Sequence, residues 1–146
     1  MAPIITLTAV TLHARLTGLL GIDPLDQWQT SLRIGLAAMF LLTGIVHFAP
    51  KFRHDMIRMI PENLPAPAAL VTITGILEIA GAAGLLIPTT APAAAICLAL
   101  LLAAMFPANI SAARRAIPLA GKPATPIGIR TAEQTLFITL AILAAL

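Results

Sequence analysis

The feature that most constrains this chain is a set of four long apolar stretches separated by prolines. A helix needs about 17–25 mostly apolar residues to cross the hydrocarbon core of a bilayer, and each stretch falls in that range. Proline lies at the boundaries of the first three stretches, where a residue without an amide hydrogen begins or ends a helix. No strand-like alternation competes with this interpretation. The expected spans cover about residues 31–48, 67–87, 91–113 and 130–146.

The composition excludes the soluble and disordered classes. The chain has 146 residues, of which 59% are apolar and 10% charged. Average soluble domains are about 45–50% apolar and about 25% charged, and disordered chains are more polar still. We therefore expect an all-α polytopic membrane protein, with a four-helix transmembrane domain over residues 27–146.

The N-terminal segment, residues 1–26, is expected to lie apart from these spans. Residues 4–20 have a helical pattern, but His13 and Arg15 interrupt it. The segment lacks the basic start and unbroken apolar stretch of a signal peptide, so we expect it to be retained. Its length and charges favour an interfacial helix over a span by about three to one.

The basic residues predict the orientation. Loops 49–66 and 114–129, together with Arg130, hold seven basic residues, against two on the other side. We expect the chain in a bacterial inner membrane, and the positive-inside rule then places both loops in the cytoplasm and both termini outside. In the first loop, charged and apolar residues alternate in short blocks, which indicates a short amphipathic segment at the headgroups.

Glu78 is the clearest candidate for function. It is the twelfth of 21 residues in the second stretch, near the middle of the bilayer, with Gly75 and Gly81 three positions away. Ionisable residues at this depth face the bundle interior and mark functional sites by default. One interpretation is a proton site or an acceptor for a polar ligand. The other, with equal weight, is a protonated acid that donates a hydrogen bond across the bundle.

Arg33 and His47 lie on one face of the first stretch. Arg33 either extends to the outer interface or pairs with Glu78, because their depths differ by only several ångströms at a rise of about 1.5 Å per residue. His47 is expected well above Glu78, so that no direct bond forms. It either bonds to water or a carbonyl, or exchanges protons, which its near-neutral pKa permits.

Asn109 follows Pro107 near the cytoplasmic end of the third stretch. We expect its amide to satisfy backbone groups that the proline frees, in preference to a ligand role. Thr131 is a candidate N-cap for the fourth stretch, with Glu133 and Gln134 after it. Asn109, Glu133 and Gln134 share the depth of His47, and these four residues could converge on one cytoplasm-facing pocket.

Several chemistries are excluded. Cys97 is the only cysteine, so the chain alone carries no thiol relay. The histidines are scattered, so we expect no metal site and no haem within the chain. The basic residues suit anionic lipid headgroups rather than nucleic acid.

Three patterns resemble the DoxX-like family of small four-helix membrane proteins. They are Gly44–Phe48 with Pro50 and Phe52, Gly75-x-x-Glu78-x-x-Gly81-x-x-Gly84 with Pro88, and Phe106-Pro107-Ala108-Asn109-Ile110. The resemblance covers about residues 32–113. It implies a four-helix bundle, makes His47, Glu78 and Asn109 the characteristic polar positions, and associates the chain with membrane redox systems.

Three functions remain open. The first is a quinone-associated redox subunit, with the quinone headgroup near His47, Asn109 and Gln134 and with electrons supplied by a partner. As an enzyme it would be an oxidoreductase subunit without a redox cofactor of its own. The second is a non-enzymatic anchoring or assembly subunit of a larger membrane complex. The third is a proton or small-solute pathway through Glu78, for which the chain would have to form a homo-oligomer.

Overall fold

The computed structural model describes residues 2–22 and 25–146, which form six α-helices joined by short connections. Four of the helices are long and apolar enough to cross a membrane, as the sequence predicts. The helices are α1 (Ala2–Leu19), α2 (Trp28–Val46), α3 (Pro50–Met59), α4 (Pro67–Leu85), α5 (Ala91–Arg114) and α6 (Ile127–Ala145).

The expected spans match α2, α4, α5 and α6 to within three residues at each end. Helix α6 begins three residues before the expected start of its span, and this difference changes which residue precedes the helix. Pro126, in an extended conformation, precedes the helix, and its carbonyl accepts the first helical hydrogen bond from Arg130. The prediction that Thr131 caps this helix is therefore wrong, because Thr131 already lies inside it.

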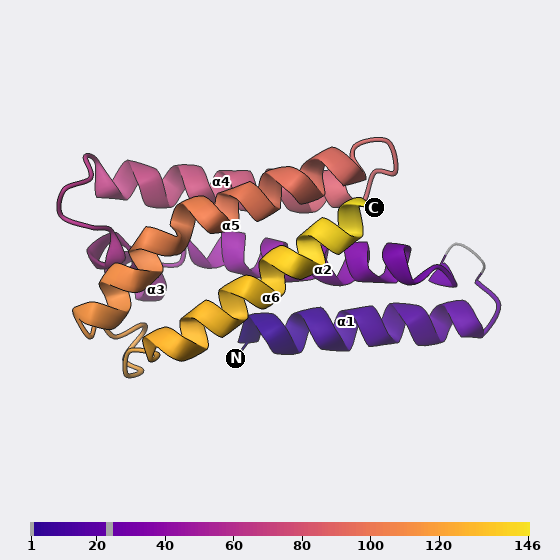
Figure 1. The fold of residues 1–146 in the computed structure, drawn as a ribbon, viewed down its shortest axis with the longest axis horizontal. Helices are drawn as coiled ribbons and strands as arrows, with labels where there is room; N and C mark the ends of the chain where they lie inside the picture. Colours follow the sequence, from indigo (N-terminus) through magenta and orange to yellow (C-terminus); the bar gives the residue numbers. More distant parts are fainter. Residues whose placement is uncertain (1, 23–24) are drawn as a thin grey trace.

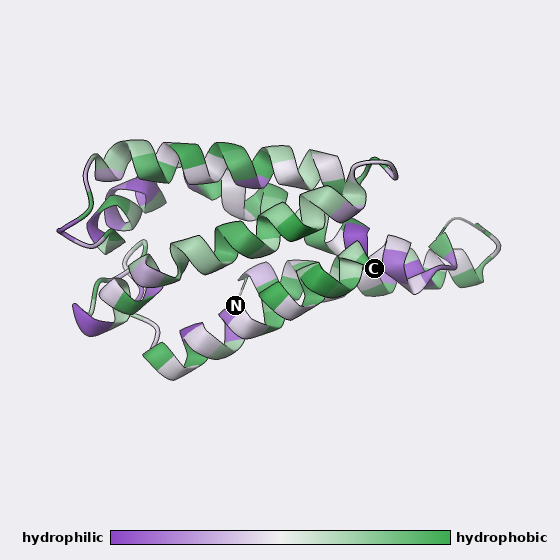
Figure 2. Ribbon diagram, turned by 45° about the horizontal axis from the view of Figure 1, so that its top comes forward, coloured by the Kyte–Doolittle hydropathy of each residue, from purple (hydrophilic) through white to green (hydrophobic). Residues whose placement is uncertain are grey.

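The long helices form one bundle around an apolar core (Figure 1). The turn after Leu85 makes α4 and α5 an antiparallel pair, and α6 crosses beside α5. The short helix α3 lies at the end of the bundle where α4 begins and α5 ends. Most residues of α4, α5 and α6 are apolar, and hydrophilic residues gather on α3 and near the ends of the bundle (Figure 2). This distribution is typical of a protein whose middle section faces lipid.

The helix expected near the N-terminus is present as α1, and it packs closely against α2, which the sequence does not predict. It runs antiparallel along α2 (Figure 1). A Cβ added at Gly35 of α2 would collide with the Thr11 side chain and lie 2.9 Å from the Leu7 carbonyl. Leu7 is part of the apolar core. The start of α1 reaches the level of Thr43, since Pro3 lines the same cavity as that residue. Its position relative to a bilayer stays a prediction.

Two glycines bring α2 and α4 into close contact. A Cβ added at Gly44 would lie 3.0 Å from the Gly75 carbonyl oxygen and 2.7 Å from Ile79 Cγ1. A Cβ at Gly75 would lie 2.7 Å from His47 Cβ. Small residues let helix backbones approach in this way inside a membrane. The contact fixes the relative depth of α2 and α4, and with it the position of His47.

Replacing Gly44 with alanine is expected to destabilise the protein by about 1–3 kcal/mol, because the new methyl group must push α4 away. Gly128→Ala is the matched control, since nothing lies within 4 Å of a Cβ there. It should not reduce stability, because alanine favours a helix over glycine by about 0.5–1 kcal/mol. Reversible unfolding in detergent measures both. Equal stability of the two variants would contradict a tight contact between α2 and α4.

Candidate functional site

A cavity of about 490 Å³ lies between α2, α4, α5 and α6. It is covered at one end by α3, through Met56 and Met59, and by loop 115–126, through Leu119 and Thr125. Most of its wall is apolar, with Met39, Phe40, Leu102, Met105 and Phe137 among the residues that line it. The polar residues on its wall are Thr43, His47, Thr74, Glu78, Asn109, Thr125, Arg130, Glu133 and Gln134.

The expected convergence of His47, Asn109, Glu133 and Gln134 on one pocket is confirmed. Glu78 lines the same cavity, which the sequence did not predict. Arg33 does not belong to this group: its Nε donates a hydrogen bond of 2.8 Å to the Ala144 carbonyl near the end of α6. The alternative in which Arg33 pairs with Glu78 is therefore wrong. Five of the six candidate residues come together.

Glu78 is the most deeply enclosed of these side chains, with 2% of its surface exposed. Its Oε2 atom is buried and has no hydrogen-bond partner in the described part of the chain. A buried polar atom without a partner is costly and calls for a specific explanation. Together with the position of Glu78 on the cavity wall, this makes the Glu78 carboxyl group a candidate contact for a ligand.

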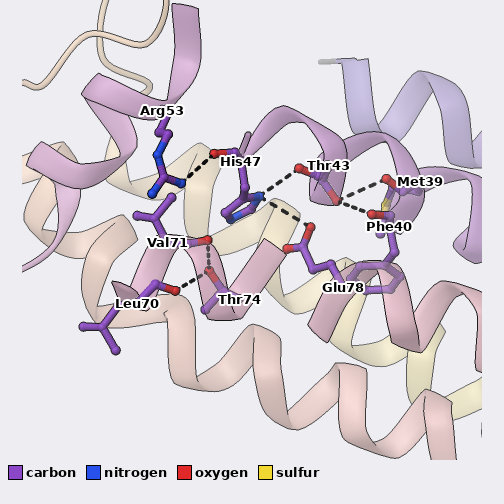
Figure 3. A network of polar contacts seen from close by, with 9 residues as sticks. All are labelled: Met39, Phe40, Thr43, His47, Arg53, Leu70, Val71, Thr74 and Glu78. Atoms are coloured by element: carbon purple, nitrogen blue, oxygen red, sulfur yellow. Dashed lines mark hydrogen bonds and ion pairs between the residues drawn. The ribbon is translucent and has the colours of Figure 1, made fainter. Parts of the chain in front are cut away.

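His47 lies directly beside Glu78 (Figure 3). Its Nδ1 atom is 2.8 Å from the Thr43 carbonyl and 3.9 Å from Glu78 Oε2. A carbonyl only accepts, so Nδ1 carries the ring proton and donates a hydrogen bond to the Thr43 carbonyl. The second distance is too long for a hydrogen bond but short enough for an ionic contact. Nε2 is the ring atom that remains for another partner.

The prediction that His47 lies well above Glu78 is thus wrong, and the reason is the offset between α2 and α4. The expectation placed the end of the first span level with the start of the second. In the structure His47 packs against Gly75, which lies eight residues into α4, or about 12 Å at the helical rise. Helix α2 therefore ends below the level at which α4 begins, and Glu78 is only one turn from Gly75.

Helix α3 covers this sunken end of α2. Arg53 NH1 donates a hydrogen bond of 3.2 Å to the His47 carbonyl (Figure 3). Arg53 NH2 donates to Thr72 Oγ1 at 2.8 Å and to the Ala68 carbonyl at 3.2 Å, both on α4. One guanidinium thus ties the short helix to both long helices and holds the His47 backbone in place.

A second polar group occupies the α5–α6 side of the cavity. Arg130 NH1 donates to Asn109 Oδ1 at 2.8 Å, and Asn109 Nδ2 donates to Gln134 Oε1 at 3.2 Å. Gln134 Nε2 in turn donates to the Leu102 carbonyl. These residues form a continuous hydrogen-bonded chain from the α6 guanidinium to the α5 backbone.

The expected role of Asn109 needs correction. Its amide binds the side chains of Arg130 and Gln134 instead of backbone groups freed by Pro107. Gln134 supplies the hydrogen bond to the α5 backbone, because α6 packs against α5 in the turn before the proline.

Four polar residues of the cavity wall are not predicted by the sequence analysis: Thr43, Thr74, Thr125 and Arg130. Threonine hydroxyls within a helix are common and usually bond to a carbonyl of the preceding turn, as Thr43 and Thr74 do here. In the sequence, Arg130 stands out only as a basic residue that indicates topology. Its spacing from Gln134 by one helical turn was the available indication that both face the same side.

Among the described residues, no three His, Cys, Asp or Glu side chains come together as they would to hold a metal ion. The site is instead a mixed cavity. It has an acid and an imidazole on the α2–α4 side, and a guanidinium with two amides on the α5–α6 side.

Comparison with known proteins gives a family. The model of a family described as a domain of unknown function (DUF8561) matches residues 36–145. The chain belongs to this family. The matched region contains every polar residue of the cavity wall and excludes α1 and Arg33. No curated protein and no solved structure matches the chain.

The hydrogen-bonded chain predicts the effect of removing its middle member. Asn109→Leu is expected to reduce the free energy of unfolding by about 1.5–3 kcal/mol, because Arg130 and Gln134 each lose a partner. The double variant with Arg130→Met should lose less than the sum of the two single variants, since it leaves no guanidinium without its acceptor. Unfolding in detergent provides the measurement. Strictly additive losses would contradict the coupling.

Proposed function

We propose that this protein is a quinone-associated subunit of a membrane redox system, in which a partner protein supplies the electrons. The observation that carries the proposal is the cavity itself. It is apolar over most of its wall and has hydrogen-bonding groups on two opposing sides. A quinone has the matching character, with an apolar ring and two carbonyl oxygens that accept hydrogen bonds. Ligand sites generally combine an apolar wall with a few convergent polar groups.

The α5–α6 side can donate to one quinone oxygen. Arg130 has five N–H donors, and its hydrogen bonds to Asn109 and Thr125 use only its Nη1 and Nε atoms. The Asn109 amide nitrogen has two N–H groups, one of which binds Gln134. Both side chains therefore retain donors, while their mutual hydrogen bonds hold them in position.

The α2–α4 side can hold a proton. Glu78 and His47 both line the cavity, and their Oε2 and Nδ1 atoms lie 3.9 Å apart. A bound quinone supplies redox chemistry in which two electrons and two protons are taken up together. Glu78 and His47 are the groups of this chain suited to exchanging a proton at the second oxygen.

The resemblance to the DoxX-like family supports the association with redox systems. It rests on residues that line this cavity, namely His47, Glu78 and Asn109. The matched family has no described function and therefore neither favours nor opposes the proposal.

A thermal-shift experiment with a short-chain quinone tests this proposal. A ligand in 100-fold excess over its Kd stabilises the folded state by about 2.7 kcal/mol, so the melting temperature of the wild-type protein should rise by several degrees. Ala108→Phe should remove the shift, because the new ring fills the cavity from α5. Ala103→Phe makes the same change at an exposed position of α5 and should retain it.

An unchanged melting curve of the wild-type protein in excess quinone would contradict quinone binding. Equal shifts in the two phenylalanine variants would place binding outside the cavity.

An anchoring or assembly subunit is the second candidate. It is favoured by the internal pairing of Arg130, Asn109 and Gln134, since each of these side chains already has a hydrogen-bond partner within the protein. This function predicts co-purification with a stoichiometric membrane partner and full function of that complex with Glu78→Gln. A quinone site predicts loss of turnover in the same variant, because glutamine cannot exchange the proton.

We further propose that the chain lies in a bacterial inner membrane with loops 49–66 and 114–129 in the cytoplasm. The basic residues of these loops lie at the end of the bundle covered by α3, and the opposite end carries the turn after α4. The positive-inside rule assigns the basic end to the cytoplasm.

Cysteine labelling tests this orientation. Cys97 is exposed, so the background variant is Cys97→Ala. With a membrane-impermeant maleimide applied to spheroplasts, Thr89→Cys should be labelled directly, and Lys51→Cys only after permeabilisation. Both positions are exposed in the structure. The reverse pattern would contradict the proposed orientation.

A further inference from the structure

A second hollow lies on the outside of the bundle, between the end of α5 and the start of α6. It is a groove of about 460 Å³ lined by Phe106, Ile110, Ala113, Arg114, Ile127 and Thr131. None of these residues lines the cavity described above. The groove and the cavity thus lie on different faces of α5.

The groove is apolar along its length and cationic at its end. The α5 residues that line it recur every three or four positions, which places them on one helix face. The last of them, Arg114, stands where α5 ends, beside the start of the basic loop. An apolar groove that ends in a guanidinium has the polarity of a phospholipid, with an acyl chain below and a phosphate above.

Arg114 is exposed, and its guanidinium makes no hydrogen bond or ion pair with the residues that the structure describes. Its neighbour Arg115 differs. That side chain pairs with Glu62 at 3.1 Å and donates to the Arg58 carbonyl at 3.0 Å, which ties loop 60–66 to the end of α5. Arg115 therefore has a structural role within the fold, whereas the charge of Arg114 is left for a partner outside it.

We propose that this groove binds one anionic phospholipid, with an acyl chain along Phe106 and Ile110 and the phosphate at Arg114. A groove on the lipid-facing surface of a membrane protein is filled by acyl chains, and the unpaired cation selects an anionic headgroup over a neutral one. In the orientation proposed above, the groove opens at the cytoplasmic leaflet, whose negative surface potential attracts basic residues. Charge-assisted hydrogen bonds from arginine to phosphate supply the specificity.

Lipid titration of the delipidated protein in neutral detergent, followed by native mass spectrometry, tests the proposal. The wild-type protein should bind phosphatidylglycerol more tightly than phosphatidylcholine. Arg114→Gln should weaken phosphatidylglycerol binding about tenfold or more and remove the preference. Lys51→Gln removes the same charge from α3 at the same end of the bundle. It should weaken binding less than about fivefold, as expected for a general surface attraction.

Two further experiments test the groove independently of the charge, and the intact lipid independently of its headgroup. Ala113→Phe should block both lipids while keeping every charge, and Ala103→Phe, exposed on the same helix, should bind as the wild type does. Glycerol phosphate, which lacks acyl chains, should not displace phosphatidylglycerol at equal concentration.

Equal effects of Arg114→Gln and Lys51→Gln would overturn the proposal, and so would equal wild-type affinity for the two lipids. Displacement by glycerol phosphate would reassign the site to a free phosphate. The melting temperature of each variant reports its folding. Arg114→Gln changes an exposed side chain, so it remains informative even if Ala113→Phe fails to fold. None of these results depends on quinone binding.

Discussion

The close contact between Gly44 and Gly75 is the constraint on which the site depends. Because neither residue has a side chain, α2 and α4 approach until His47 Cβ occupies the space beside Gly75. Glu78, one turn further along α4, then lies within ionic distance of the imidazole. A larger residue at either glycine would move the imidazole away from the carboxyl. The same contact places the end of α2 below the start of α4, and α3 covers the end of the cavity there.

The polar groups of the cavity differ in how fully the protein satisfies them. Arg130, Asn109 and Gln134 form a hydrogen-bonded chain that ends at a backbone carbonyl. Such mutual pairing lowers the cost of keeping polar side chains between apolar helices. Glu78 is the exception, with a buried oxygen that lacks a partner in the described residues. The rigid side of the cavity is therefore suited to orienting a ligand, and the incompletely satisfied side to exchanging a proton with it.

Helix α5 contributes residues to both the internal cavity and the external groove. Near Pro107, Met105 and Asn109 line the internal cavity, while Phe106 and Ile110 line the external groove. Consecutive positions diverge in this way because each residue turns about 100° around a helix. The end of α5 is in turn held by Arg115, through Glu62 and the carbonyl of Arg58. Arg115 therefore links α3, which covers the cavity, to the end of α5, which lines the groove.

Hydropathy and proline act locally along the chain, so the sequence alone predicts the four long apolar helices, the short helical segment after Pro50 and the polar residues available for function. It also predicted that His47, Asn109, Glu133 and Gln134 share one depth. The packing of the helices brings Glu78 to the same cavity, places Arg33 against the Ala144 carbonyl and lays α1 lengthwise along α2, and none of these contacts could be predicted from the sequence. These contacts depend on the axial offset between neighbouring helices. Distances along one helix are fixed by its rise per residue, whereas the relative height of two helices depends on where their backbones can touch.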